Sequence, residues 1–427
     1  MNLLQFIEYL ESSTVYSPNI SRIVKRESKA AEYSIFPDYM PENMVNILNS
    51  DGIKGLYSHQ RQALDFYQSR ENFVITTPTA SGKTLSYLLP VLLDKLKHPQ
   101  GRHLFMFPTK ALAQDQLATY RHWAAKLEVD WKISTFDGDT SPDERRNVKA
   151  AGDFILTNPD MLHSGILPHH NNWKNLFQNL RTIILDEMHI YSGIFGSSVA
   201  NVLRRLNRIL ENYGANPVFI FSSATIANPE ELAASLTGKK FYAIKKSGAP
   251  EGEKYFMFYN PPVLDREGTR ESPYRAAATI GAELLGNKLA TLFFTRSRNR
   301  AEILRDLLLN RVQPELKSQI QSYRGGYLPL ERRNIEHRMR NKDLLGIIST
   351  NALELGIDIG ILSAVVSVGY PGRIGSVIQQ FGRAGRQKEP ALAILVATMG
   401  AMDQYLMKKE VSNLRFSILN LLTVWYF

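Results

Sequence analysis

The chain has 427 residues, which is long enough for two or three domains with cores of their own. Its hydrophobic content of 44% and charged content of 22% are ordinary for a globular protein, and no apolar run approaches the ~20 residues of a membrane span. The absence of cysteine excludes disulfides and thiolate metal sites. The formal net charge of +10 favours a polyanionic partner such as nucleic acid, although many basic proteins bind no polyanion.

The first part of the chain, residues 1–50, is predicted to be a helical extension that belongs to neither domain core. It begins without the basic segment of a secretory signal, so we expect a cytoplasmic protein that does not contact a membrane. After it, runs rich in Ile, Val and Phe predict buried parallel strands at 72–77, 103–109, 132–138, 153–158, 181–187 and 218–224. Helical patterns such as 110–126 and 195–212 separate these strands, which indicates an α/β domain over residues 51–248.

A second alternating set of strands and helices follows a segment rich in Gly, Pro and charge. We interpret this segment, residues 249–272, as a linker that contains a short strand, KYFMFY. Further strands are predicted at 289–295, 344–350, 364–369 and 391–397, with helices at 297–310, 330–340 and 374–381. The second α/β domain therefore spans 273–400 and is followed by a tail, residues 401–427.

The stretch TPTASGKTL, residues 77–85, joins a predicted strand to an apolar helical pattern. In the pattern G-x-x-x-x-G-K-[ST], loop N–H groups surround phosphates, the lysine reaches them, and the hydroxyl binds Mg²⁺. Gly82, Lys83 and Thr84 fit this pattern, whereas Thr77 replaces the first glycine. The stretch predicts a nucleotide phosphate site, and the alternative is an ordinary turn with a surface lysine.

A pair of acids ends another predicted strand, in TIILDEMH. Parallel α/β sheets bind ligands at the carboxyl ends of their strands, so Asp186 and Glu187 are placed where a nucleotide would lie. Asp186 is expected to hold Mg²⁺, and Glu187 to orient and deprotonate the attacking water. The alternative is a pair of acids that only stabilises the N-terminus of the next helix.

Two arginines of the second domain, Arg383 and Arg386, lie three residues apart in QQFGRAGR. That spacing predicts one face of a helical turn. Guanidinium groups from a second domain are what an arginine finger requires, because they neutralise charge on the transferring phosphoryl group. The alternative is a pair of surface arginines.

Read in order, residues 50–400 resemble a superfamily 2 helicase of the DExH type. The residues that carry the resemblance are LYSHQ (56–60), TASGKT (79–84), FPTKALAQDQ (107–116), TNPDML (157–162), LDEMH (185–189), SSAT (222–225), FFTRSR (293–298), TNALELGIDIG (350–360) and QQFGRAGR (379–386). The last two are most similar to the Hrq and mitomycin-repair-factor helicases, which resemble RecQ enzymes. The resemblance implies an α/β fold of two tandem RecA-like domains, ATP and Mg²⁺ as cofactors, and 3′-to-5′ movement on DNA.

The resemblance also assigns roles to single residues. It implies that Tyr57 and Gln60 contact the adenine. It implies further ATP contacts from the phosphate-loop residues Thr79, Ala80, Ser81, Gly82, Lys83 and Thr84, from Asp186, and, across the domain cleft, from Gly356 and Asp358. Nucleic-acid contacts are implied for Thr109, Lys110, Asn158, Asp160, Arg296, Ser297 and Thr350, although helix capping or turn formation is an equal alternative for the small polar ones. His189, Ser223 and Thr225 are implied to couple the two sites.

One departure from the similar family concerns a four-cysteine module that usually follows the second motor domain. This sequence has no cysteine, so we expect a member that lacks the module, and ATP hydrolysis is a safer expectation than processive unwinding. Two other functions stay open, with DNA favoured over RNA as the partner. One is an RNA helicase or remodeller, and the other is a nucleotide-dependent binding module that does not move along its track.

Overall fold

The computed structural model describes residues 1–78, 81–224, 226–324, 327, 329–354, 360, 362–385 and 389–408. It divides into two compact units, each with a seven-stranded sheet. The first unit is Ala31–Ala249, and the second joins Met1–Ala30 to the described residues from Pro250 onward. No helix in these described ranges has the length and apolar character needed to cross a membrane.

The sheet of the first unit is parallel throughout. Its strand order is β10 (Tyr242–Ile244), β4 (Phe73–Ile75), β9 (Val218–Ser222), β8 (Leu180–Leu185), β5 (Arg102–Met106), β7 (Phe154–Thr157) and β6 (Ile133–Thr135). Successive residues point to opposite faces, so Phe73 and Ile75 belong to one apolar core and Val74 to the other. A short antiparallel pair, β2 (Tyr33–Ser34) and β3 (Leu56–Tyr57), precedes the sheet.

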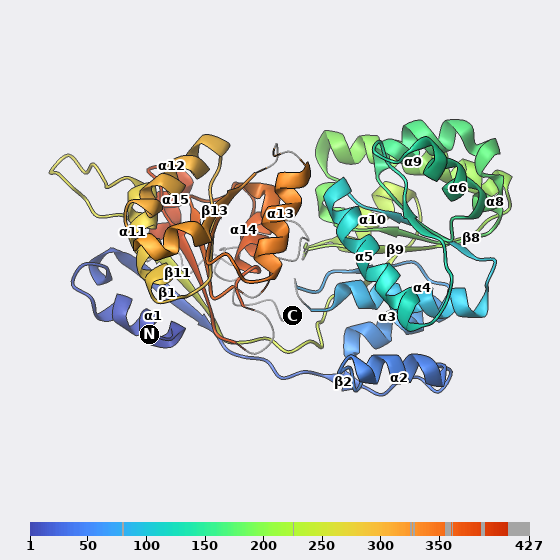
Figure 1. Cartoon of the computed structure of the whole chain (residues 1–427), viewed down its shortest axis with the longest axis horizontal. Coiled ribbons are helices and arrows are strands. Elements are labelled where there is room, and N and C mark those ends of the chain that lie inside the picture. Colours follow the sequence, from blue (N-terminus) through green and yellow to red (C-terminus); the bar gives the residue numbers. More distant parts are fainter. Residues whose placement is uncertain are drawn as a thin grey trace. The chain divides into compact units, whose positions relative to one another are not determined.

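Helices cover both faces of this sheet, as expected for strands that are apolar on both sides. One face packs against α2 (Glu42–Ser50), α3 (Ser58–Gln68), α4 (Lys83–Lys97) and α5 (Lys110–Lys126). The other packs against α6 (Pro142–Ala151), α8 (Lys174–Gln178), α9 (Gly193–Asn212) and α10 (Pro229–Thr237), with the short α7 (Pro159–Met161) beside them. Figure 1 shows α8 and α9 on one side of strands β8 and β9, and α3 and α4 on the other.

The second unit has a mixed sheet. Its strand order is β1 (Ile20–Arg26), β11 (Lys254–Tyr259), β16 (Ala391–Val396), β15 (Ala364–Val368), β12 (Thr291–Phe294), β14 (Gly346–Ser349) and β13 (Ile320–Tyr323). Only β1 is antiparallel among these paired strands. The helices of the unit are α1 (Leu3–Ser12), α11 (Pro273–Gly286), α12 (Arg298–Leu309), α13 (Pro329–Arg340), α14 (Ile374–Phe381) and α15 (Ala401–Met407).

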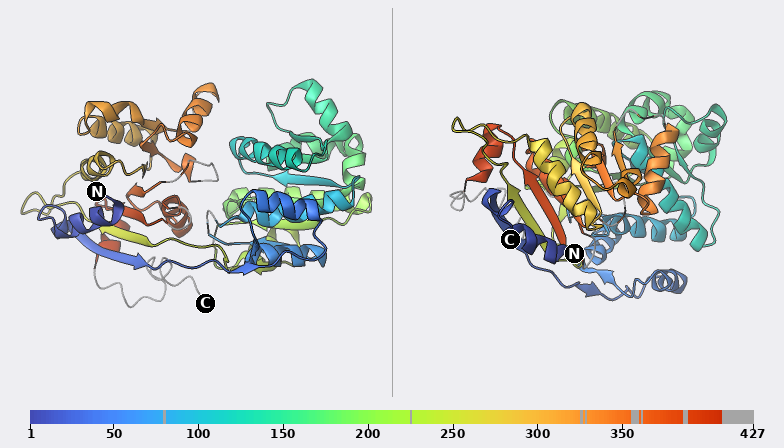
Figure 2. Two further views of the ribbon diagram at one scale, coloured as in Figure 1. Left: turned by 60° about the horizontal axis from the view of Figure 1, so that its bottom comes forward. Right: turned by 60° about the vertical axis from the view of Figure 1, so that its left-hand side comes forward.

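The expectation that residues 1–50 belong to neither core is wrong. Helix α1 buries Leu3, Phe6, Ile7 and Leu10 in the core of the second unit, and β1 pairs with β11 along that sheet's edge (Figure 2, blue beside yellow-green). Helix α2 buries Met44 and Leu48 in the core of the first unit. The first 50 residues are therefore shared between the two units. The physical reason is that α1 and α2 each carry an apolar stripe that must be covered.

The α/β fold with two parallel-type sheets is confirmed, and each strand predicted from the sequence is present. Five strands were not predicted: β1, β2, β3, β10 and β13. The strand expected inside the 249–272 segment is β11, which lies between β1 and β16 in the second sheet. This segment is therefore partly sheet and partly connection.

Candidate nucleotide site and nucleic-acid interface

The phosphate loop connects β4 to α4 at the carboxyl edge of the first sheet. Gly82 immediately precedes α4 with φ of 83° and ψ of 28°, a left-handed conformation that suits glycine. A Cβ added to Gly82 would lie 2.8 Å from the Gln60 side-chain nitrogen, so a larger residue would meet both steric and backbone strain. The loop is therefore shaped around a glycine at the start of a helix, which is a suitable anion site.

Lys83 lies in the first turn of α4 with its ammonium group turned back toward the loop. Its Nζ donates to the Thr77 carbonyl at 2.9 Å and to the Ser223 carbonyl at 3.3 Å. The Thr77 and Ser81 hydroxyls share a 2.7 Å hydrogen bond and are both buried. Thr77, which replaces the first glycine of the pattern, thus contacts both Ser81 and Lys83 of the loop.

The acid pair follows β8 at the same edge. Asp186 accepts hydrogen bonds through Oδ1 from the Glu187 N–H at 3.0 Å and from the Ser222 hydroxyl. Glu187 has φ of 51° and ψ of 46°, a left-handed conformation that is uncommon for a residue with a side chain. Such strain is found preferentially where function fixes the backbone. Glu187 Oε2 is buried and has no hydrogen-bond partner among the described residues.

The electrostatics of this pair fit a bound cation. Burial, followed by the neighbouring Glu187 carboxylate, raises the pKa of Asp186 to about 6. Ser222 and Lys83 act in the opposite direction but do not cancel it. A buried carboxylate with incomplete charge compensation is the kind of oxygen ligand that Mg²⁺ binds, which agrees with the predicted role of Asp186. Thr84, half-buried in the first turn of α4, completes the predicted set.

Three consecutive residues at the end of β9 join the parts of the site. Ser222 donates to Asp186, the Ser223 carbonyl accepts from Lys83, and the Ala224 N–H donates to His189 Nδ1 at 3.1 Å. His189 Nδ1 also lies 3.5 Å from Glu187 Oε2. Any movement of this segment therefore reaches the lysine, the aspartate and the histidine together. Sequence reasoning named Ser223 and His189 but missed Ser222, although two serines directly after an apolar strand were a usable signal.

Gln60 links the phosphate loop to the start of α3. Its Oε1 accepts from the Tyr57 N–H at 2.9 Å, and its Nε2 donates to the Gly82 carbonyl at 3.3 Å. Gln60 is buried, whereas Tyr57 is half-buried and stacks on His59 with ring centroids 5.8 Å apart. The two residues predicted to contact adenine therefore lie beside the loop predicted to hold phosphates.

Several residues predicted to contact nucleic acid cap helices. Thr109 accepts from the Leu112 N–H at 3.3 Å, Asn158 from the Met161 N–H at 2.8 Å, and Ser297 from the Arg300 N–H at 3.4 Å. These caps agree with the structural alternative for these residues. They also place each side chain at a helix N-terminus beyond the carboxyl end of a strand, where phosphates bind favourably.

The remaining residues predicted to contact nucleic acid lie near the carboxyl ends of strands in both units. Lys110 forms an exposed ion pair with Asp139 at 2.8 Å, and Asp160 lies in the first turn of α7. Arg296 is half-exposed and donates to the Tyr370 carbonyl at 2.6 Å. Thr350 directly follows β14. The structure thus groups them by unit, with Lys110 and Asp160 in the first and Arg296 and Thr350 in the second.

The predicted helical placement of the arginine pair is wrong for Arg383. Helix α14 ends at Phe381, and Arg383 lies in the turn that follows, where its Nη2 donates to the Glu354 carbonyl at 2.8 Å. Gly385, with φ of 72°, directs the chain away from a helix. The predicted residues Thr79, Ala80, Thr225, Gly356, Asp358 and Arg386 lie outside the described residues.

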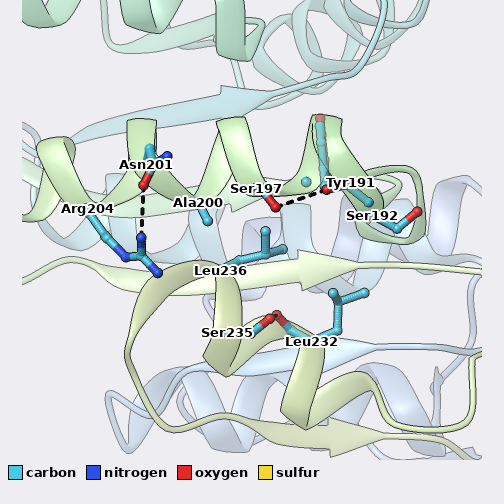
Figure 3. A pocket seen from close by; sticks show the side chains of 11 residues that line it. Tyr191, Ser192, Ser197, Ala200, Asn201, Arg204, Leu232, Ser235 and Leu236 are labelled. Atoms are coloured by element: carbon cyan, nitrogen blue, oxygen red, sulfur yellow. Dashed lines mark hydrogen bonds between the residues drawn. The ribbon is translucent and has the colours of Figure 1, made fainter.

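A separate hollow of about 370 Å³ lies between α9 and α10 (Figure 3). Tyr191, Ser192 and Ser197 line one part of it, and Arg204 lines another, donating to Asn201 Oδ1 at 2.9 Å. Its lining in the described part of the chain includes none of the predicted site residues. The hollow is therefore separate from the predicted nucleotide site, whose residues Lys83 and Asp186 lie at the carboxyl edge of the sheet.

Comparisons with known families match both units. The profile described as DEAD/DEAH box helicase matches residues 57–232, and the helicase conserved C-terminal domain matches residues 278–388. The uncharacterized ATP-dependent helicase YprA of Bacillus subtilis is 48% identical over 384 residues, covering 90% of this chain and 51% of that protein. The ATP-dependent helicase HRQ1 of Saccharomyces cerevisiae is 38% identical over 414 residues, covering 94% of this chain and 38% of that one.

A solved structure is also similar over nearly the whole chain. The crystal structure of the DUF1998 helicase MrfA bound to DNA superimposes with a TM-score of 0.91 at 46% identity, covering 95% of this chain and 57% of that one. The same protein bound to DNA and AMPPNP gives a TM-score of 0.90. The chain thus spans about half the length of the first relatives that it matches.

Proposed function

This chain belongs to the DEAD/DEAH-box helicases of superfamily 2, and on that premise we propose that it is an ATP-dependent DNA helicase or translocase. The observation that carries the proposal is the group of contacts at the carboxyl edge of the first sheet. There Lys83, Asp186 and His189 each contact one of three consecutive residues at the end of β9. A site that only stabilised the fold would not need a buried acid in a strained conformation beside them.

The residues act as follows in this proposal. ATP supplies the phosphoanhydride bond. Thr84 and Asp186 would hold Mg²⁺, which would supply positive charge to the phosphates. Lys83 exchanges its contacts with the Thr77 and Ser223 carbonyls for phosphate oxygens. Glu187 Oε2, which lies 3.5 Å from His189 Nδ1 and makes no hydrogen bond in the described part of the chain, accepts the proton of the attacking water.

The release of Lys83 from Ser223 gives a route from nucleotide to nucleic acid. When the ammonium turns to phosphate, the segment 222–224 loses its contact with Lys83. Its contacts with His189 and Asp186 remain, and the Ser223 N–H still donates to the Ile75 carbonyl at 2.9 Å. Arg383 and Arg386 of the second unit supply the arginine finger that makes hydrolysis depend on both units, as the resemblance implies.

DNA is the proposed track because MrfA, at 46% identity, has been solved with DNA. Movement from 3′ to 5′ and a role in DNA repair follow from the family resemblance alone. Contacts to phosphates from Lys110 and Arg296 and from the capped helix N-termini give grip without reading base sequence.

The experiment that tests this function has two arms. The first measures ATP hydrolysis with saturating single-stranded DNA or RNA of the same sequence, and we expect DNA to stimulate more strongly. The second measures strand displacement on duplexes with a 3′ or a 5′ tail, and we expect activity on the 3′-tailed substrate. Lys83→Ala is the control without activity. Equal stimulation by RNA, or displacement only with a 5′ tail, would contradict the proposed track or direction.

A further inference from the structure

The segment between β11 and α11 forms an ordered hairpin, residues 260–271, at the carboxyl edge of the second sheet. Val263 and Arg270 pair as an antiparallel bridge, the Leu264 N–H donates to the Thr269 carbonyl at 2.7 Å, and the Glu271 N–H donates to the Pro262 carbonyl at 2.9 Å. The Asp265 carboxylate accepts from the Thr269 N–H at 2.9 Å and closes the turn. In Figure 1 the hairpin is the yellow loop that extends beyond α11.

The hairpin is held at its base by α15. Asn260 and Gln404 exchange two side-chain hydrogen bonds of 3.2 and 3.1 Å. Gln404 also donates to the Thr398 carbonyl at 2.7 Å, at the end of β16. The hairpin and α15, together called the projection, are therefore connected to each other and to the end of β16.

This projection is joined directly to Arg296, a residue proposed to contact nucleic acid. The adjacent residue of α15, Asp403, is buried and accepts from the Tyr370 N–H at 2.9 Å and the Thr398 N–H at 2.7 Å. Its Oδ1 lies 3.5 Å from Arg296 Nη2. One carboxylate thus ties together the segments after β12, β15 and β16, and its neighbour Gln404 ties them to the hairpin.

The projection carries apolar side chains that are exposed in the described part of the chain. Val263 and Leu264 of the hairpin are 51% and 66% exposed, and Met402 of α15 is 51% exposed. Met399 and Tyr405 are also exposed. We call these five residues, Val263, Leu264, Met399, Met402 and Tyr405, the hairpin–α15 surface. Exposed aliphatic side chains can be inserted between stacked bases, as in proteins that kink DNA.

The charge around this surface suits a nucleic acid. Arg296 and Arg300 lie beside Tyr274 at the start of α11, and the Arg300 guanidinium stands over the Tyr274 ring at 5.0 Å. Ser297 caps α12 between the two arginines, so a helix N-terminus adds its N–H groups. Phosphates bound by these cationic groups would bring the adjoining bases toward the hairpin–α15 surface. A protein partner would need no such basic neighbourhood.

We propose that the hairpin–α15 surface contacts the bases at a junction of single-stranded and double-stranded DNA and separates the two strands. The inference rests on the proposed function, because it needs a motor that pulls one strand past the projection. It goes further in naming the element that converts movement into unwinding. The bases are contacted by shape and apolar area, so no sequence preference is expected at this element.

The test uses the double variant Val263→Ser/Leu264→Ser in the full chain, with Ile35→Ser, which replaces an 80% exposed side chain of the first unit, as the matched control. Stimulation of ATP hydrolysis by single-stranded DNA should change by less than about twofold, because both replaced side chains are exposed. Strand displacement on a tailed duplex should fall roughly tenfold or more, because the unstacking contact is lost. Normal displacement by the double variant would overturn the proposal and assign the surface to a protein contact.

A second readout separates this proposal from the proposed function. A forked duplex with 2-aminopurine at its first base pair is mixed with the protein without ATP. The parent and Ile35→Ser should raise the fluorescence by unstacking the base, and the double variant should not. An unchanged signal with the parent would overturn the strand-separating role even if ATP hydrolysis is normal. A raised signal without DNA-stimulated ATP hydrolysis would support base unstacking by the hairpin–α15 surface and would contradict the proposed motor function.

Discussion

The parallel strands of the first sheet begin at one edge, the amino edge, and finish at the other, the carboxyl edge. Buried carboxylates are paired with cations at the amino edge and lie beside each other at the carboxyl edge. At the amino edge, Asp94 receives two hydrogen bonds from Arg181 at 2.6 and 2.7 Å, and Lys95 pairs with Asp153. Burial alone would raise the pKa of Asp94, but Arg181 and the neighbouring histidines hold it below its ordinary value. At the carboxyl edge, Asp186 stands beside a second carboxylate, and its pKa rises to about 6.

Under the proposed function, this difference separates charges that stabilise the fold from charges that bind a ligand. Each carboxylate of the amino edge has its cation within the protein. Those of the carboxyl edge have only partial compensation from Lys83, so they gain most when a cation binds. Substitutions at the amino edge should therefore change the free energy of unfolding, and substitutions at the carboxyl edge should change turnover.

Glu187→Gln tests the carboxyl edge and has the largest expected effect. Loss of a general base should lower ATP hydrolysis by about 10²–10⁴-fold, whereas ATP binding should persist because Lys83 and Asp186 remain. Phosphate release in saturating DNA measures the first quantity, and titration with a fluorescent ATP analogue measures the second. The control, Glu211→Gln on the exposed side of α9, should keep the parent rate. A variant that retains parent turnover would show that Glu187 does not take the proton.

Asp94→Asn tests the amino edge. Removing one partner of this largely buried pair leaves Arg181 without its carboxylate, and the free energy of unfolding should fall by about 3 kcal/mol. Urea unfolding followed by tryptophan fluorescence reports on this unit, since Trp123 and Trp173 are buried in it. Asp130→Asn, which breaks an exposed pair with Lys132, should have almost no effect. A lower rate of ATP hydrolysis in folded Asp94→Asn protein would contradict the prediction that the amino edge affects only stability.

His103→Leu tests the same edge through pH. His103 is buried, neither ring nitrogen has a hydrogen-bond partner in the described part of the chain, and burial lowers its pKa to about 3. Because the unfolded histidine takes up a proton near pH 6.5, its contribution is present above that pH and is lost as the pH falls. The parent should lose about 2 kcal/mol from this residue between pH 7 and pH 5.

The leucine variant should remove that part of the pH dependence. Urea unfolding of the parent, His103→Leu and the exposed control His122→Leu at pH 7 and pH 5 gives the three slopes. We expect His122→Leu to follow the parent. Equal pH dependence in the parent and His103→Leu would mean that the buried ring does not stay neutral.

Much of this arrangement was predictable from sequence, for a physical reason. Most of the strands predicted from the sequence are apolar runs, as is typical of buried parallel strands, and such runs are visible without a structure. Gly82, Lys83, Asp186 and Glu187 follow strands directly, so their placement at one edge follows from parallel topology.

What the sequence did not reveal depends on tertiary contacts. Strand β1 pairs along the free edge of β11, and its half-polar pattern predicts no strand by itself. The Ala224 N–H and the Thr77 carbonyl are backbone groups, and every residue type has such groups, so their contacts cannot be predicted from residue identity. Gln60 was expected to contact adenine, yet its link to Gly82 needs the fold to bring residues 22 apart in sequence together. The turn at Arg383 was missed because Gly385, with φ of 72°, takes the chain out of the helical conformation that the spacing predicts.

The proposal that hydrolysis needs both units is tested most directly by Arg386→Ala in saturating single-stranded DNA. An arginine finger stabilises transition-state charge, so turnover should fall roughly a thousandfold while ATP binding stays near that of the parent. Arg386→Lys should restore little, because a point charge does not reproduce the planar guanidinium. If Arg386→Ala instead hydrolyses ATP at the parent rate, the second unit does not complete the site. The chain would then be a nucleotide-dependent binding protein and not a two-unit motor.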